Sequence, residues 1–111
     1  MISQMDLCLV PFPFSDQSGR KVRPVVVISK NDFNEKSEDV IVVGVTSNLS
    51  KDRFSILFSN EDLIEGKLHS ACCVKVENIL KIDKEMIIKK IGIISPEKFG
   101  QVLNCLFRIF K

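Results

Sequence analysis

Three groups of side chains in this sequence have the types and spacing to act on a phosphodiester, and the first is built around Arg23. Arg23 follows a loop that contains Gly19 and basic residues, and it precedes the apolar run Pro24–Ile28. A buried strand would hold the guanidinium at its rim, where a planar fork of donors fits a phosphate. The alternative is an arginine whose stem covers the edge of a barrel.

The second and third groups lie at the ends of other expected strands. Thr46 ends an apolar strand and is followed by Ser47 and Asn48, whereas Lys75 and Glu77 are two residues apart and would share one strand face. Such a carboxylate could take the proton from a 2′-hydroxyl, while the cations stabilise a phosphorane without any metal. Turn residues and a solvated ion pair are the alternative interpretation of the same positions.

Other chemistries find little support in the sequence. The only histidine, His69, lies in an expected loop and is predicted to be at the surface. The chain has no phosphate-binding glycine motif and no acids at metal-ligand spacing. The cysteines form no C-x-x-C pair and are expected to be reduced and buried; they are Cys8, Cys72, Cys73 and Cys105. We therefore expect neither a cofactor nor a metal.

Composition indicates a single domain over residues 1–111, with 45% hydrophobic residues. A net charge of +2 does not indicate a surface that wraps duplex nucleic acid, so any nucleic-acid site must be a local patch. There is no visible signal peptide and no apolar run of about 20 residues. These features predict a soluble, cytoplasmic protein with no membrane contact.

The apolar patterning predicts a mainly β fold with a C-terminal α-helix. Strands are expected over residues 5–12, 24–30, 40–46, 53–59, 71–76, 80–82 and 87–94, with polar connections over 15–23, 31–39 and 60–70. Ser95 and Pro96 predict a helix start, and Gly44 suggests a bulge or a close backbone approach. The helix would bury one apolar face, made of Phe99, Val102, Leu103, Leu106 and Phe110. Short connections favour a small antiparallel SH3-like barrel, and a homodimer would cover its open edges.

Two early segments carry a resemblance to a known family. Residues 6–16 read DLCLVPFPFSD and residues 19–29 read GRKVRPVVVIS. Together they resemble the opening of the MazF/PemK (Kid-like) toxins of type II toxin–antitoxin modules. The resemblance continues through residues 45–47, 70–83 and 90–92 and into the final helix, so it covers nearly the whole chain in order.

The resemblance implies a PemK-type, SH3-like barrel that forms a homodimer. It also implies a sequence-specific, metal-independent endoribonuclease that cleaves single-stranded RNA and thereby inhibits translation and growth. A cognate antitoxin would occupy the RNA groove, and any operator DNA binding would be indirect, through that antitoxin. By position, Arg23 matches the family's catalytic arginine, which would serve as acid or as stabiliser of the phosphorane. Thr46 matches a hydroxyl that contacts the scissile phosphate, and Glu77 matches an acid proposed as general base in some members.

The expected RNA contacts lie around these three residues, and they are Arg20, Lys21, Ser47, Asn48 and Lys75. Lys75 stands where some members have Arg, and a lysine lacks the bidentate fork. Met5 stands where a Gly is usual. Because Lys75 replaces an arginine, the resemblance alone does not assign which residue acts as the general acid.

Two other functions fit the same fold class. One is a CcdB-like toxin that inhibits DNA gyrase, and the other is a non-catalytic SH3-like binding module. Neither needs Arg23, Thr46 and Glu77 to come together, so their convergence would favour the nuclease.

Overall fold

A computed structural model describes residues 1–12, 21–49 and 53–111. Seven strands, two short 3₁₀ turns and two α-helices make up this part of the chain. The strands are β1 (Asp6–Phe12), β2 (Lys21–Val27), β3 (Asp39–Thr46), β4 (Ser55–Phe58), β5 (Leu63–Gly66), β6 (Cys72–Asp83) and β7 (Lys89–Ile94). The helices are α1 (Asn31–Lys36) and α2 (Pro96–Phe110), and the 3₁₀ turns are η1 (Asn60–Asp62) and η2 (Lys84–Met86).

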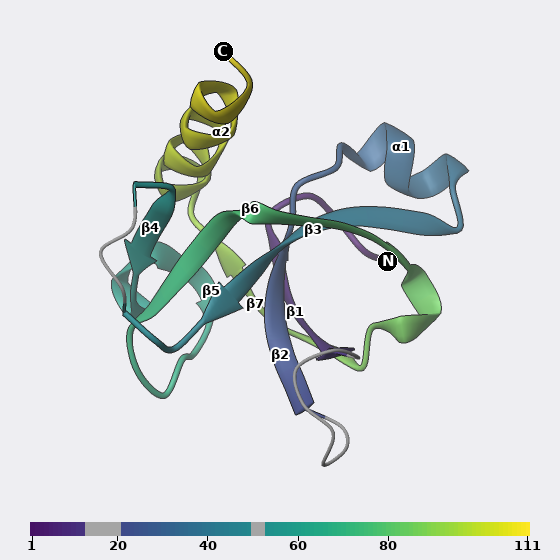
Figure 1. The fold of residues 1–111 in the computed structure, drawn as a ribbon. Helices are drawn as coiled ribbons and strands as arrows, with labels where there is room; N and C mark the ends of the chain where they lie inside the picture. Colours follow the sequence, from purple (N-terminus) through teal and green to yellow (C-terminus); the bar gives the residue numbers. More distant parts are fainter. Residues whose placement is uncertain (13–20, 50–52) are drawn as a thin grey trace.

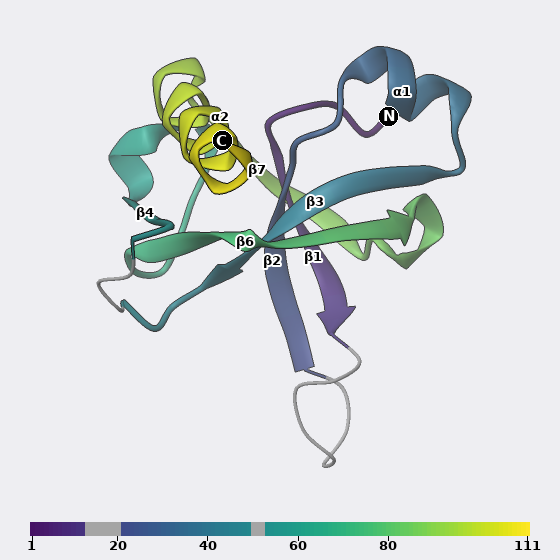
Figure 2. The same cartoon turned by 45° about the horizontal axis from the view of Figure 1, so that its top comes forward.

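The strands form one antiparallel sheet in the order β4-β6-β3-β2-β1-β7-β5. The sheet curls so that its two edge strands lie on the same side of the molecule, below α2 in Figure 1. Figures 1 and 2 both show the far ends of β1 and β2 extending away from β3. The expected fold class, mainly β with a C-terminal helix, is confirmed as a curled half-barrel.

Alternating side chains give the sheet two apolar faces. The main core lies inside the curl and includes Leu7, Val43 and Phe58, and α2 contributes Val102 and Cys105 to it. A second cluster lies on the other face of these strands and consists of Cys8, Val10, Val25, Val27, Val40 and Val42. Because successive residues of a strand point to opposite sides, β1, β2 and β3 supply both clusters at once. All four cysteines are buried and free, as predicted.

The region expected to hold two short strands, 71–76 and 80–82, is a single long strand, β6. The β3–β6 ladder pairs Val43 with Ile79 and then Gly44 with Lys75. This shift leaves residues 76–78 without a β3 partner, so the bulge suggested by Gly44 is confirmed. The predicted gap between two strands is therefore an irregularity within one strand.

Strand β2 begins at Lys21, although a loop was predicted up to Arg23. The β1–β2 ladder continues through Val10↔Arg23 to Phe12↔Lys21, and pairing with β1 overrides the polar sequence. Pro24 is tolerated because the β2–β3 ladder ends at Val25, so Pro24 needs no donor on that side. Arg23 is consequently part of a strand and not its flank.

Strand β5 was missed, because 60–70 was expected to be a connection without a strand. It pairs with β7 through Leu63↔Ile94 and Gly66↔Gly92. Gly66 has φ +94°, and a Cβ there would lie 2.1 Å from the Ile91 carbonyl oxygen. Only glycine allows the backbones of β5 and β7 to lie this close together, and the curl of the sheet brings the two strands to this distance.

Met5 also adopts a left-handed conformation, with φ 80°. Its N–H donates to the Val27 carbonyl at 2.9 Å, and its carbonyl accepts from the Ile94 N–H at 3.0 Å. These two bonds hold the residue between β2 and β7. Glycine would adopt this conformation at a lower cost than a residue with a side chain.

Helix α2 begins as predicted: the Ser95 Oγ accepts from the Lys98 N–H at 3.1 Å, and Pro96 is the first helical residue. Phe99 and Val102 are buried, but Phe110 is 72% exposed, so its predicted burial is wrong. The helix extends past the curled sheet at its C-terminal end (Figure 1). No helix in the described residues has the length and apolar character needed to cross a membrane.

Ser29 organises a buried polar network that attaches α1 to the sheet. Its hydroxyl donates to the Asn34 Oδ1 and accepts from the Ile41 N–H at 3.0 Å, while the Asn34 Nδ2 donates to the Ser29 carbonyl at 3.0 Å. Ser29 is 8% exposed and Asn34 is 2% exposed. Water therefore cannot replace the hydroxyl easily.

We expect Ser29→Ala to lower the free energy of unfolding by about 1–3 kcal/mol, because it leaves buried polar groups of Asn34 and Ile41 unsatisfied. Urea unfolding measures this change. Ser70→Ala is the matched control, since Ser70 is exposed and its side chain should contribute little. Equal stability of the two variants would contradict the role of the network.

Candidate functional site

Arg23 lies inside β2, directly opposite Val10 of β1. The side chain is half-buried, and its Nε atom is buried. The β1–β2 ladder holds the backbone on both sides of this position, so the guanidinium extends from a rigid strand. The structure therefore anchors Arg23 more firmly than a place at the rim would.

Thr46 and Lys75 lie on the same face of the sheet as Arg23. The β2–β3 ladder ends at Val25↔Gly44, and the same register continued by two residues would bring Arg23 opposite Thr46. Lys75 is opposite Gly44 in the β3–β6 ladder. Residues directly opposite one another point to the same side, as do alternate residues of one strand. We call this shared surface the Arg23 face.

Ser55 of β4 holds Lys75 from the other side. The two residues are paired in the β4–β6 ladder, and the Lys75 Nζ donates to the Ser55 Oγ at 3.2 Å. Gly44, on the opposite flank of Lys75, has no side chain to occupy the space above β3. Sequence reasoning missed Ser55, although the alternation that buries Phe54, Ile56 and Phe58 places Ser55 on the other face.

Thr46 is the last residue of β3, and its side chain is already oriented by a turn. The Thr46 Oγ1 accepts from the Asn48 N–H at 3.1 Å. This bond uses an acceptor position and leaves the hydroxyl hydrogen able to donate to a ligand. Ser47 and Asn48 follow as exposed residues beside the Arg23 face.

Glu77 is exposed and lies in the β6 bulge. It is therefore two residues beyond Lys75, but no β3 residue stands opposite it. The ladders place Arg23, Thr46 and Lys75 on one face of neighbouring strands, whereas Glu77 lies two residues beyond Lys75 and has no partner on β3. Arg20 lies outside the described residues, and of Lys21 only the backbone, paired with Phe12, is described.

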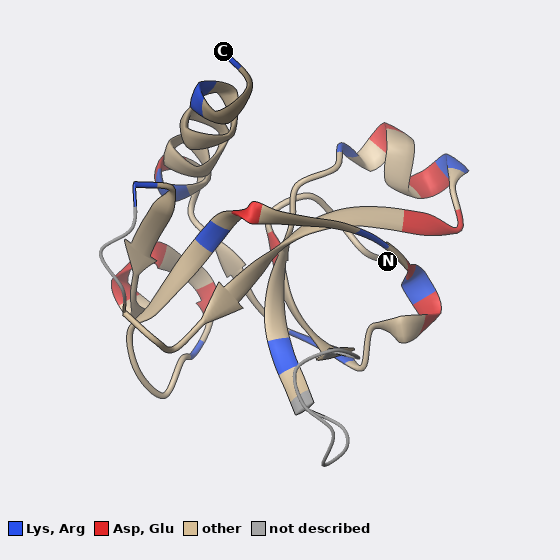
Figure 3. Ribbon diagram, viewed as in Figure 1, with Lys and Arg blue, Asp and Glu red and all other residues tan. Residues whose placement is uncertain are grey.

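Charged residues of both signs are spread along the fold, and basic positions occur on both β2 and β6 (Figure 3). His69 is exposed, as predicted. Burial raises the pKa of the Cys8 thiol to about 11, with a further rise from the nearby Asp6 carboxylate. Burial also raises the pKa of the Cys72 thiol. These cysteines therefore offer no thiolate for nucleophilic chemistry at neutral pH.

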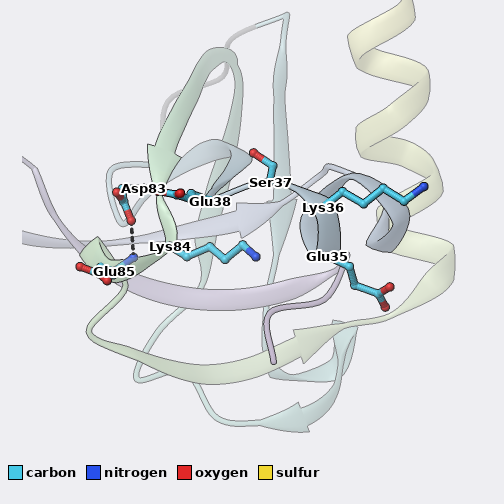
Figure 4. Close-up of a pocket in the computed structure, with 7 residues that line it drawn as sticks. All are labelled: Glu35, Lys36, Ser37, Glu38, Asp83, Lys84 and Glu85. Atoms are coloured by element: carbon cyan, nitrogen blue, oxygen red, sulfur yellow. Dashed lines mark hydrogen bonds between the residues drawn. The ribbon is translucent and has the colours of Figure 1, made fainter.

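A pocket of about 410 Å³ lies between the end of α1 and η2, and its lining is rich in acids (Figure 4). Glu35, Glu38, Asp83 and Glu85 line it together with Lys36, Ser37 and Lys84. The four carboxylates do not converge on one point in Figure 4, and the Asp83 Oδ1 accepts from the Glu85 N–H at 2.8 Å. Within residues 1–12, 21–49 and 53–111, no cluster of His, Cys, Asp or Glu could hold a metal ion.

Comparison with known proteins relates this arrangement to a family. Residues 3–110 match the model of the "PemK-like, MazF-like toxin of type II toxin-antitoxin system" family. A curated relative, "Endoribonuclease MazF" of Staphylococcus epidermidis, is 32% identical over 98 residues, which cover 88% of this chain and 79% of that protein.

Solved structures share the fold at lower identity. An endoribonuclease in complex with its cognate antitoxin, from a mycobacterial species, has a TM-score of 0.81 at 15% identity and covers 99% of this chain and 95% of its own. A MazE–MazF structure from Deinococcus radiodurans has a TM-score of 0.78 at 16% identity, with 98% and 95% covered. The family model spans both ends of the described fold and includes every strand of the Arg23 face. The chain thus belongs to the PemK-like, MazF-like toxin family of type II toxin–antitoxin systems.

Proposed function

We propose that this protein is an endoribonuclease toxin that cleaves single-stranded RNA in a sequence-specific manner without a metal ion. The observation that carries the proposal is the register that puts Arg23, Thr46 and Lys75 on one face of neighbouring strands. Two cations and a hydroxyl on adjacent strands form a surface that fits a phosphodiester. The curated relative's name, an endoribonuclease, supports the same activity, and neither gyrase inhibition nor simple binding is favoured by the comparisons.

In the proposed reaction, the 2′-oxygen attacks the neighbouring phosphorus, the bond from phosphorus to the 5′-oxygen breaks, and the leaving 5′-oxygen takes a proton from water. The products are a 2′,3′-cyclic phosphate, or a 3′-phosphate after hydrolysis, and a 5′-hydroxyl. Arg23 stabilises the charge of the phosphorane with its paired donors, and Thr46 donates its hydroxyl hydrogen to a phosphate oxygen. Lys75 adds a second positive charge from β6.

Glu77 is the proposed acceptor of the 2′-hydroxyl proton. Its carboxylate is exposed and follows Lys75 on the bulge, where binding of RNA can bring it to the reacting group. Ser47 and Asn48, together with Arg20 and Lys21 before the strand, are proposed RNA contacts. The proposed substrate is RNA that is translated, so we place the activity in the cytoplasm.

Digestion of a long single-stranded RNA in EDTA, followed by mapping of the ends, tests the activity. We expect cuts at a limited set of sequences that carry 5′-hydroxyl ends. RNA that stays intact, or cleavage that requires an added divalent ion, would overturn the proposal.

The proposed protein partner is a cognate antitoxin whose acidic segment covers the Arg23 face. A structural neighbour was solved in complex with its cognate antitoxin. Cations on the Arg23 face complement an acidic chain, and such a chain would exclude RNA from the same surface. Contact with operator DNA would then be indirect, through the antitoxin.

We also propose a homodimer, which an apolar groove beside α2 supports. The groove has a volume of about 370 Å³ and is lined by Ile28, Ile79, Leu103, Leu106, Phe107 and Phe110. Phe107 is 71% exposed and Phe110 is 72% exposed. No charged residue lines the groove, so a second copy with the same apolar surface fits it better than an acidic antitoxin segment.

Sedimentation equilibrium of the isolated protein tests this interface. We expect a dimer for the unchanged chain and a shift toward monomer for a Phe107→Ser, Phe110→Ser variant. Arg108→Ser is the control, because Arg108 is exposed on the same helix turn. A monomer at high concentration, or a dimer unaffected by the double change, would contradict the assignment.

Ser55 should raise the rate of the proposed reaction by holding Lys75 in position. We expect Ser55→Ala to reduce kcat for RNA cleavage by about 3–10-fold, because loss of this hydrogen bond makes the Lys75 ammonium group less well positioned and removes about 1 kcal/mol of transition-state stabilisation. Ser55→Thr keeps the hydroxyl and should restore most of the rate. Single-turnover cleavage measures the effect. Equal rates for the Ala and Thr variants would show that the Ser55 hydroxyl does not contribute to the reaction.

A further inference from the structure

A second pocket lies at the open end of the curled sheet, beside the far ends of β1 and β2. Its volume is about 400 Å³, and its walls come from β1, β2, β7 and the segment that joins β5 to β6. We call it the end pocket, and it is lined by Leu9, Pro24, Lys67, Leu68, His69, Ser70, Cys72, Lys89 and Ile91. This volume falls within the range of small-molecule sites.

The floor of the end pocket is apolar and continues the main core. Leu9 and Pro24 are paired in the β1–β2 ladder, on the face opposite to the Arg23 face. Leu68 and Ile91 pack against the main core from the other side. A flat apolar group, such as a nucleobase, can lie on such a floor.

The wall formed by residues 67–70 is held in place. The Asn60 Nδ2 donates to the Leu68 carbonyl at 3.0 Å, and the Asn60 Oδ1 accepts from the Leu68 N–H. The Cys72 Sγ donates to the Ser70 carbonyl at 3.5 Å. These bonds shape the pocket before any ligand arrives, which lowers the cost of binding.

The rim of the end pocket is cationic. Lys67 and Lys89 are both exposed, and neither forms an ion pair with any residue that the structure describes. No carboxylate is among the lining residues, in contrast to the acidic pocket of Figure 4. His69 adds a ring with both donor and acceptor capacity. An apolar floor beneath two ammonium groups fits a ligand with a flat ring and a phosphate.

We infer that the end pocket binds one nucleotide of the RNA, with its base on the apolar floor and its phosphate at Lys67 and Lys89. The inference rests on the proposed function. Pro24 in the floor is the sequence neighbour of Arg23, and the two side chains lie on opposite faces of β2. The β2–β3 ladder ends at Val25, and we infer that the RNA passes around the unpaired edge of β2 beyond this residue. RNA sequence is read from bases that are splayed out into such sites, so the end pocket selects the base at one position of the cut sequence.

Titration of the full chain with each nucleoside 5′-monophosphate, followed by NMR of the leucine and isoleucine methyl groups, tests binding directly. We expect saturable shifts of Leu9, Leu68 and Ile91, strongest for one base, and weaker binding of ribose 5-phosphate and inorganic phosphate. Lys67→Ala and Lys89→Ala should each weaken binding about tenfold. Lys36→Ala, on α1, is the control and should leave binding unchanged. The inference would be overturned if no saturable shifts occur or if inorganic phosphate binds as tightly as the nucleotides. Tighter binding of an acidic peptide than of nucleotides would also overturn it.

A second measurement separates this inference from the proposed function. Cleavage maps of a long RNA should lose preference at one position in the Lys67→Ala, Lys89→Ala double variant, while Arg23 still supports cutting. If the double variant cuts the same sequences at the same rates, the end pocket does not contribute to RNA recognition, and the proposed nuclease activity still stands. Nucleotide binding without any RNA cleavage would refute the nuclease and retain the pocket.

Discussion

Arg23→Ala is expected to lower kcat for RNA cleavage by about 10²–10³-fold, the effect of removing one preorganised charge donor from a developing oxyanion. Arg23 extends from a strand that is paired with β1, and this pairing fixes the backbone that carries the guanidinium. The half-buried stem adds some packing, and we expect a loss of about 1 kcal/mol or less in the free energy of unfolding. Single-turnover cleavage of a short RNA and thermal unfolding measure the two quantities.

Two further variants make the result specific to the guanidinium. Arg23→Lys keeps the charge but lacks the fork, so its rate should lie between those of the unchanged chain and the alanine variant. Arg108→Ala removes an exposed arginine from α2 and should leave the rate unchanged. If Arg23→Ala cleaves within about threefold of the unchanged protein, Arg23 does not touch the reacting phosphate.

Phe58→Ala is expected to destabilise the fold by about 3–5 kcal/mol, because it removes the largest fully buried side chain and leaves a cavity in the main core. Phe58 is 1% exposed and lies where β4 pairs with Cys72 of β6. Since small domains have about 5–15 kcal/mol in total, the thermal midpoint should fall by more than about 10 °C.

Leu57→Ala is the matched control for this prediction. Leu57 is the neighbouring residue of the same strand, but it points outward and is 57% exposed. Its truncation should change the free energy of unfolding by about 0.5 kcal/mol or less. Similar losses for the two variants would mean that β4 does not alternate between core and surface as described.

The sequence predicted the parts of the fold that depend on local patterns. The alternation of Phe54, Ile56 and Phe58 identified β4, and the run from Val40 identified β3. Ser95 and Pro96 identified the start of α2, because a cap acts within one helical turn. The candidate residues Arg23, Thr46 and Lys75 were also visible, since strand ends with cations and hydroxyls stand out against apolar runs.

The relations between strands could not be predicted in the same way. The residues of β5 carry little apolar pattern, and the strand exists because Gly66 fits against Gly92 when the sheet curls. The register shift in β6 decides that Lys75, and not a later residue, lies opposite Gly44. A strand register is fixed by partners far away in the chain, so no local window contains it.

The candidate residue types and the periods of the strands and helix were therefore determined by the sequence alone. The tertiary structure decided that Arg23 lies within β2, that Ser55 holds Lys75, and that Pro24 turns its ring toward a pocket on the opposite face. The physical reason is that side-chain type and periodicity are properties of short segments. The common face of Arg23, Thr46 and Lys75 exists only after three strands have paired in one register.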